Sequence, residues 1–97
     1  MIRHVVLFRW TAEATAEQKR RVAEELFRLP ALVPSLRDYR LGANLGINPG
    51  TFDFAVAADF DDVDGYMAYR DHPAHRAVVT EFIQPIVTER AAVQYEC

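Results

Sequence analysis

Several features that mark specialised classes of protein are missing from this 97-residue chain. Its single cysteine, Cys97, excludes an internal disulfide and makes a cytoplasmic location the default expectation. The longest apolar runs, Val5–Phe8 and Phe54–Ala58, are far shorter than the roughly 20 residues of a membrane span. Arg3 and His4 argue against a signal peptide. No membrane attachment is therefore expected.

Basic residues are not in surplus either. The chain has 11 Lys and Arg against 14 Asp and Glu, a net charge of −3, whereas nucleic-acid-binding domains usually gather an excess of basic residues on one face. The glycine-containing turn Gly46–Gly50 has no phosphate-loop lysine. We therefore expect no nucleic-acid partner and neither a nucleotide nor a redox cofactor.

What is present is the composition of one globular domain spanning residues 1–97, with 51% hydrophobic and 26% charged residues and no repeat, linker or low-complexity tract. A chain this short buries only about 60–65% of its unfolded surface when it folds alone. It nevertheless carries 6 Phe, 4 Tyr and 1 Trp. This surplus indicates that part of the apolar surface is buried against a partner.

Hydrophobic periodicity divides the chain into alternating strands and helices. Runs rich in β-branched and aromatic residues, with a period of two, predict four strands: Ile2–Trp10, Leu36–Leu45, Phe52–Phe60 and Arg90–Glu96. Apolar residues at helical spacing predict three helices: Thr15–Leu29, a short helix from Asp61 or Asp62 to about Tyr69, and Pro73–Thr88.

Capping residues and prolines indicate where the helices begin and end. Thr15 and Gln18 have the spacing of a capping box, in which each side chain bonds to the backbone of the other residue. Pro30 is expected to end the first helix, and Pro85 to kink the last one. The dipeptide His72-Pro73 is expected to interrupt the helical run, because a residue before proline avoids the helical region.

The predicted order, β-α-β-β-α-β, is the ferredoxin-like arrangement of an α+β protein, with a four-stranded antiparallel sheet and the helices on one face. The alanines of Phe52–Phe60 are expected to face the helices, where their small size allows a close approach. The other face is then expected to carry Phe8, Trp10 and Val56, which are too apolar to leave in water. Two such open sheet faces packed together would form a homodimer, a dimeric α+β barrel.

Three segments resemble the stress-responsive α/β-barrel (Dabb) family: His4–Trp10, Gly42–Asn44 and, most specifically, the run Tyr69-Arg70-Asp71-His72-Pro73-Ala74-His75. The resemblance covers nearly the whole chain and implies a dimeric α+β barrel built from two ferredoxin-like protomers. Family membership determines the fold better than the function, because one fold hosts many activities.

The resemblance also implies site residues. In family polyketide cyclases of the olivetolic acid cyclase type, the pattern Tyr-x-x-His-Pro-Ala-His supplies a catalytic tyrosine and a catalytic histidine, which match Tyr69 and His75 here. The first-strand histidine, near the pocket of that enzyme, matches His4. His72 precedes proline at a helix start, so its ring can cap the helix, and contact with a ligand is the other interpretation.

These residue types are suited to acid–base chemistry. His75 falls in the first turn of a helix, where the dipole disfavours the imidazolium and leaves a neutral base. The Tyr69 phenol could orient that base or donate to a substrate carbonyl. The functional hypothesis is proton abstraction next to a carbonyl, followed by aldol-type closure or isomerisation. The alternative is that both residues serve packing and hydrogen bonding at a helix junction.

A metal site is not expected, because His72 and His75 have no definite third ligand, and nothing singles out an axial ligand for haem.

Three functions stay open. The chain binds a small hydrophobic molecule in a pocket between sheet and helices, or it is a cyclase- or isomerase-like enzyme, or it is a non-catalytic, stress-related structural protein. A pocket with Tyr69 and His75 facing inward would support the first two.

Overall fold

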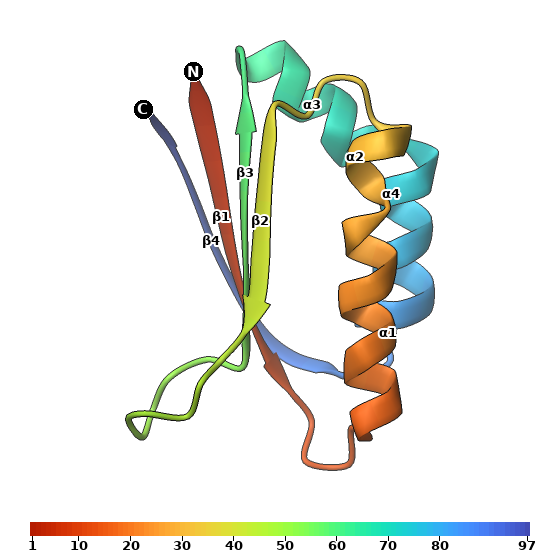
Figure 1. Ribbon diagram of the computed structural model, residues 1–97, viewed down its shortest axis with the longest axis vertical. Coiled ribbons are helices and arrows are strands. Elements are labelled where there is room, and N and C mark those ends of the chain that lie inside the picture. The colour runs from red at the N-terminus through yellow and green to blue at the C-terminus, as the bar shows by residue number, and fades with distance from the viewer.

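The structure, a computed structural model, describes residues 1–97 as one sheet covered on one side by helices (Figure 1). The strands are β1 (Ile2–Trp10), β2 (Asp38–Ala43), β3 (Phe54–Phe60) and β4 (Val87–Glu96). The helices are α1 (Ala16–Phe27), α2 (Leu29–Leu32), α3 (Val63–Asp71) and α4 (Pro73–Val78), which continues into a π-helical turn at Val79–Ile83. None of these helices combines the length and apolar character needed to cross a membrane.

The sheet has the strand order β2-β3-β1-β4, and all three neighbouring pairs are antiparallel. The helices lie together on one face, and the other face carries none (Figure 1). This is the predicted ferredoxin-like α+β fold, which is therefore confirmed. The capping box is confirmed as well, since Thr15 and Gln18 each accept a hydrogen bond from the other's backbone N–H, at 3.1 and 2.9 Å.

The predicted assignment of the two sheet faces is wrong. Phe8, Trp10 and Val56 are 6%, 8% and 3% exposed, and they belong to the core beneath the helices. Phe8 stacks on Trp10 with ring centroids 5.4 Å apart. Both faces of β1 are apolar at the centre of the strand, and a period of two separates the faces without saying which one meets the helices. The larger rings lie where helix side chains can surround them.

The side of the sheet without helices, called the open face below, carries smaller apolar residues. Val5 lies between Ala57 and Val93 on the neighbouring strands, and Leu7 lies between Ala55 and Ala91. The alanines predicted to meet a helix are therefore on the open face. Val93 is 55% exposed there.

The prolines act differently from the prediction at two places. Pro30 does not end the helical run but lies in the first turn of α2, where its missing N–H needs no intrahelical partner. The last helical segment ends at Ile83 rather than Thr88, so Pro85 follows the helix instead of kinking it. β4 begins at Val87, three residues earlier than predicted, and β2 and β3 are shorter than predicted.

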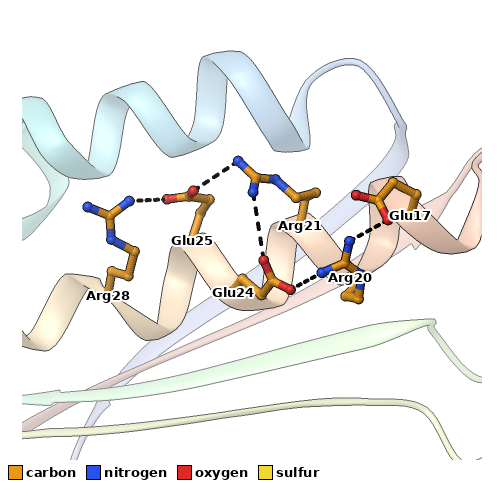
Figure 2. A network of polar contacts seen from close by, with 6 residues as sticks. All are labelled: Glu17, Arg20, Arg21, Glu24, Glu25 and Arg28. Atoms are coloured by element: carbon orange, nitrogen blue, oxygen red, sulfur yellow. Dashed lines mark hydrogen bonds and ion pairs between the residues drawn. The ribbon is translucent and has the colours of Figure 1, made fainter.

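The outer side of α1 is charged along its length. Residues three and four apart form a ladder of ion pairs: Glu17, Arg20, Arg21, Glu24, Glu25 and Arg28 (Figure 2). Exposed pairs of this kind stabilise a helix by only about 0.3–0.5 kcal/mol each. Their main consequence is that the arginines of α1 are neutralised within their own helix.

Candidate functional site

A cavity of about 400 Å³ lies between the helix-facing side of the sheet and the helices α1, α3 and α4. Nine of its fourteen lining residues are hydrophobic, with the two tyrosines counted among them. The other five are two histidines, two arginines and one glutamine, and no carboxylate lines the cavity. Its volume falls in the range of small-molecule binding sites.

Three of the four site residues predicted from the sequence, His4, Tyr69 and His75, line this cavity. The two from the helices meet because the chain breaks sharply between α3 and α4. Tyr69 lies in the last turn of α3 and His75 in the first turn of α4, and their ring centroids are 4.2 Å apart.

His72 lies between these helices and outside the cavity lining. Its Nδ1 accepts a hydrogen bond from the backbone N–H of Ala74 at 3.0 Å, so the ring caps α4. Pro73 follows at the first helical position, where its ring favours helix initiation. A role of His72 in ligand binding stays a prediction.

The orientation of His75 determines which ring nitrogen is free. Its Nδ1 lies 3.1 Å from the carbonyl oxygen of Arg70, which can only accept, so Nδ1 carries the proton and donates. In the neutral ring, Nε2 then holds the lone pair. Burial lowers the pKa of His75 below its usual value, the bond to the Arg70 carbonyl opposes this, and the charge of Arg90 lowers it further. His75 is therefore neutral at pH 7, with Nε2 available as a base.

Tyr69 is paired with a second tyrosine that the sequence analysis did not single out. The hydroxyls of Tyr69 and Tyr39 are 2.9 Å apart. Burial raises the pKa of Tyr69 to about 12, and burial also raises the pKa of Tyr39. Both phenols are protonated at neutral pH. When Tyr39 donates to the oxygen of Tyr69, the Tyr69 proton is free for a molecule in the cavity.

His4 approaches the same cavity from β1. It is 4% exposed, and its Nδ1 accepts a hydrogen bond from the side-chain amide of Gln94 on β4 at 2.7 Å. Its ring centroid lies 4.8 Å from that of Tyr66. Burial lowers its pKa to about 4, with smaller contributions from Arg90 and His75. His4 is therefore a neutral polar group in the wall of the site.

This buried histidine makes stability depend on pH. In the unfolded chain the pKa of His4 is near its usual value of about 6.5. Between about pH 6.5 and 4, the unfolded state therefore binds a proton at His4 and the folded state does not. The free energy of unfolding therefore decreases as the pH falls from about 6.5 to 4. We expect the wild type to lose about 2–3 kcal/mol more than His4→Gln over this window. Urea unfolding at each pH, at one protein concentration, measures the difference, and parallel losses in both proteins would contradict it.

The arrangement suits proton transfer at a carbonyl compound. His75 offers a neutral imidazole nitrogen and Tyr69 a phenol proton, and both line a cavity with mostly hydrophobic walls. No group of three or more His, Cys, Asp or Glu side chains is placed to hold a metal ion.

The sequence of this chain matches a known protein family. Residues 2–97 match the model of the Stress responsive A/B Barrel Domain. An uncharacterized protein of Streptomyces coelicolor is 37% identical over 81 residues, which cover 81% of this chain and 84% of that protein.

Solved structures agree with this match. A dimeric ferredoxin-like protein of unknown function from Thermobifida fusca is 47% identical, with 99% of this chain and 90% of that chain covered and a TM-score of 0.92. A dimeric protein with a ferredoxin-like fold from Bacteroides fragilis is 32% identical, with 99% and 95% covered and a TM-score of 0.83. The resemblance seen in the sequence is confirmed, and the chain belongs to the stress-responsive A/B barrel domain family.

Proposed function

We propose that this protein is an acid–base catalyst that removes a proton next to the carbonyl group of a small hydrophobic molecule. The observation that carries the proposal is the fixed tautomer of His75, whose Nδ1 is bonded to the Arg70 carbonyl while the ring lines the cavity. A neutral imidazole held in this way accepts a proton through Nε2 without reorganising. The reaction would be of the lyase, cyclase or isomerase type.

Tyr69 completes the proposed reaction. Proton removal beside a carbonyl places negative charge on the carbonyl oxygen, and a phenol proton aimed at that oxygen stabilises the charge. Tyr69 stays protonated because its pKa is raised to about 12 by burial. Tyr39 acts as a positioning residue, because it does not line the cavity itself and its hydroxyl contacts that of Tyr69.

A second function, binding without turnover, is favoured by the mostly apolar lining. In that case the protein would hold a hydrophobic molecule, with His4 and Tyr69 as hydrogen-bonding contacts. A stress-related structural role without a ligand is the third outcome that the experiment below distinguishes. A cytoplasmic location stays our expectation from the lone Cys97.

We infer that the working form is a homodimer joined through the open face. The open face is apolar at its centre, where Val5 and Leu7 lie between alanines of β3 and the pair Ala91 and Val93 of β4, and the relative from Thermobifida fusca is a dimeric protein. The loop between β2 and β3 extends away from the helices on this same side (Figure 1), and its Leu45 and Ile47 are 85% and 77% exposed. A second copy of the chain would cover both features.

The exchange of carbon-bound hydrogen tests the proposed chemistry without knowledge of the natural substrate. A neutral aryl ketone, 4-propylacetophenone, is incubated with the protein in D₂O, and loss of the methyl-ketone signal is followed by NMR. We expect saturable exchange above the buffer rate, lost as the pH falls through the lowered pKa of His75 because the imidazolium cannot accept a proton. Binding without exchange would overturn catalysis in favour of the second function. Absence of binding would overturn both.

Tyr69 and Tyr39 should contribute unequally to the exchange rate constant. Tyr69→Phe removes the donor to the developing oxyanion and is expected to lower the exchange rate constant by about 10²-fold, the lower end for such a donor. Tyr39→Phe leaves that donor in place and should cost less, with the Michaelis constant little changed. The measurement is the same exchange assay, with near-UV circular dichroism as a check on packing. A larger loss in Tyr39→Phe than in Tyr69→Phe would exclude this division of roles.

A further inference from the structure

We propose that the molecule bound in the cavity carries a carboxylate, and that Arg90 binds it. This inference rests on the cavity of the proposed function and names the substrate class: a hydrophobic keto acid, whose apolar part lies between sheet and helices. Its carbonyl would meet Tyr69 and His75, and its carboxylate would meet Arg90 on β4. Nothing in the acid–base chemistry itself requires this charge.

Arg90 is placed toward the cavity by the register of the sheet. It lies opposite Phe8, whose side chain is in the core under the helices, so Arg90 projects from the same face. It is among the lining residues, at an exposed position where β4 forms the edge of the sheet. A ligand buried in the cavity could therefore extend a charged group to Arg90 while that group stays close to water.

The charge of Arg90 is unusual in this protein because no acidic side chain neutralises it. Eight of the ten arginines form ion pairs with Asp or Glu, and only Arg76 and Arg90 form none. Arg70, the other arginine of the lining, is neutralised by Asp71 at 2.9 Å. No Asp or Glu lines the cavity. The cavity thus presents one free guanidinium to whatever it holds.

The positive charge of Arg90 acts on both histidines that line the cavity. Burial is the main cause that lowers the pKa of His4 and of His75, and the positive charge of Arg90 lowers both further. A cation with two donor edges and no partner is suited to a carboxylate, which it binds through paired, charge-assisted hydrogen bonds. An apolar cavity with such a cation at its edge selects amphiphilic anions over neutral molecules of the same shape.

Two probes that differ only in charge test this selection. Binding of 4-propylbenzoate and of its neutral amide, 4-propylbenzamide, is measured by titration calorimetry at pH 7.5. We expect the carboxylate to bind about tenfold more tightly, the lower end for a hydrogen bond to a charged group. Arg90→Gln should abolish this preference by weakening carboxylate binding about tenfold while leaving amide binding unchanged, which also shows that the variant is folded.

Arg76→Gln is the matched control. Arg76 is also exposed and unpaired, but it does not line the cavity, so its loss should leave the preference intact. Equal binding of both probes to the wild type, or a preference that survives Arg90→Gln, would overturn the role of Arg90 and leave the proposed catalysis standing. Binding of neither probe would overturn the cavity as a ligand site, and the proposed function with it.

Discussion

Replacing His75 with asparagine is expected to lower the rate constant for exchange of the ketone hydrogen by about 10²–10⁴-fold, the usual contribution of a general base. Asparagine is chosen because its side-chain amide can still donate to the carbonyl oxygen of Arg70, the partner of His75 Nδ1. The variant can therefore keep the hydrogen bond to this turn while it loses the basic nitrogen Nε2. The Michaelis constant for the ketone should change little, so the loss falls on turnover.

The neighbouring histidine provides the comparison. His72→Asn places a carboxamide oxygen where the ring now accepts from Ala74, and asparagine is a good helix cap. Because His72 lies outside the cavity lining, this variant should exchange at close to the wild-type rate. Equal losses in the two variants would show that the helix break, and not the base, is what the reaction needs, and full activity in His75→Asn would remove His75 from the mechanism.

Replacing Val93 with aspartate is expected to convert the proposed dimer into monomers. Val93 is 55% exposed in the protomer, so the substitution disturbs no core contact, yet it lies on the open face, midway along the edge strand β4 and beside Val5. In a symmetric interface each variant dimer would bury two added carboxylates, and Arg3 on the same face is already paired with Asp59. An uncompensated buried charge costs about 3–5 kcal/mol, which corresponds to a dissociation constant raised by about 10²–10⁴-fold.

Val63→Asp is the matched control, since Val63 is 59% exposed but lies at the first position of α3, away from the open face. An acidic residue there is favourable to the helix dipole. Analytical ultracentrifugation over a range of concentrations should show a dimer for this variant and for the wild type, and a monomer for Val93→Asp. If all three proteins sediment alike, the interface is not on the open face.

The sheet combines features that follow from local sequence with one that does not. The order of strands and helices along the chain and the capping box were predictable because each depends on short-range periodicity and local hydrogen bonds. The face that meets the helices was not. β1 has apolar residues on both sides, Val5 and Leu7 on one and Phe8 and Trp10 on the other. Choosing between them requires the volumes of the facing layers, which depend on residues far away in the chain.

In the candidate site, too, some residues could be predicted from the sequence and others could not. Tyr69 and His75 were predictable because a recognisable motif holds both of them within seven residues around the His72-Pro73 break. Tyr39 was not, because its hydroxyl meets Tyr69 across a separation of 30 residues, and Gln94 reaches His4 across 90. Arg90 could not be singled out from the sequence either. It differs from most other arginines only in having no acidic side chain near it in the folded protein.

The amino-acid sequence by itself determined the element types, their order and the residues that bring two helices together at an abrupt break, since all of these follow from contacts between neighbours in the chain. Only the tertiary structure decided which side of the sheet became the core, which phenol supports Tyr69, and which cation stays free at the cavity. Those outcomes arise from the pairing of distant strands, which brings together side chains that no local pattern connects.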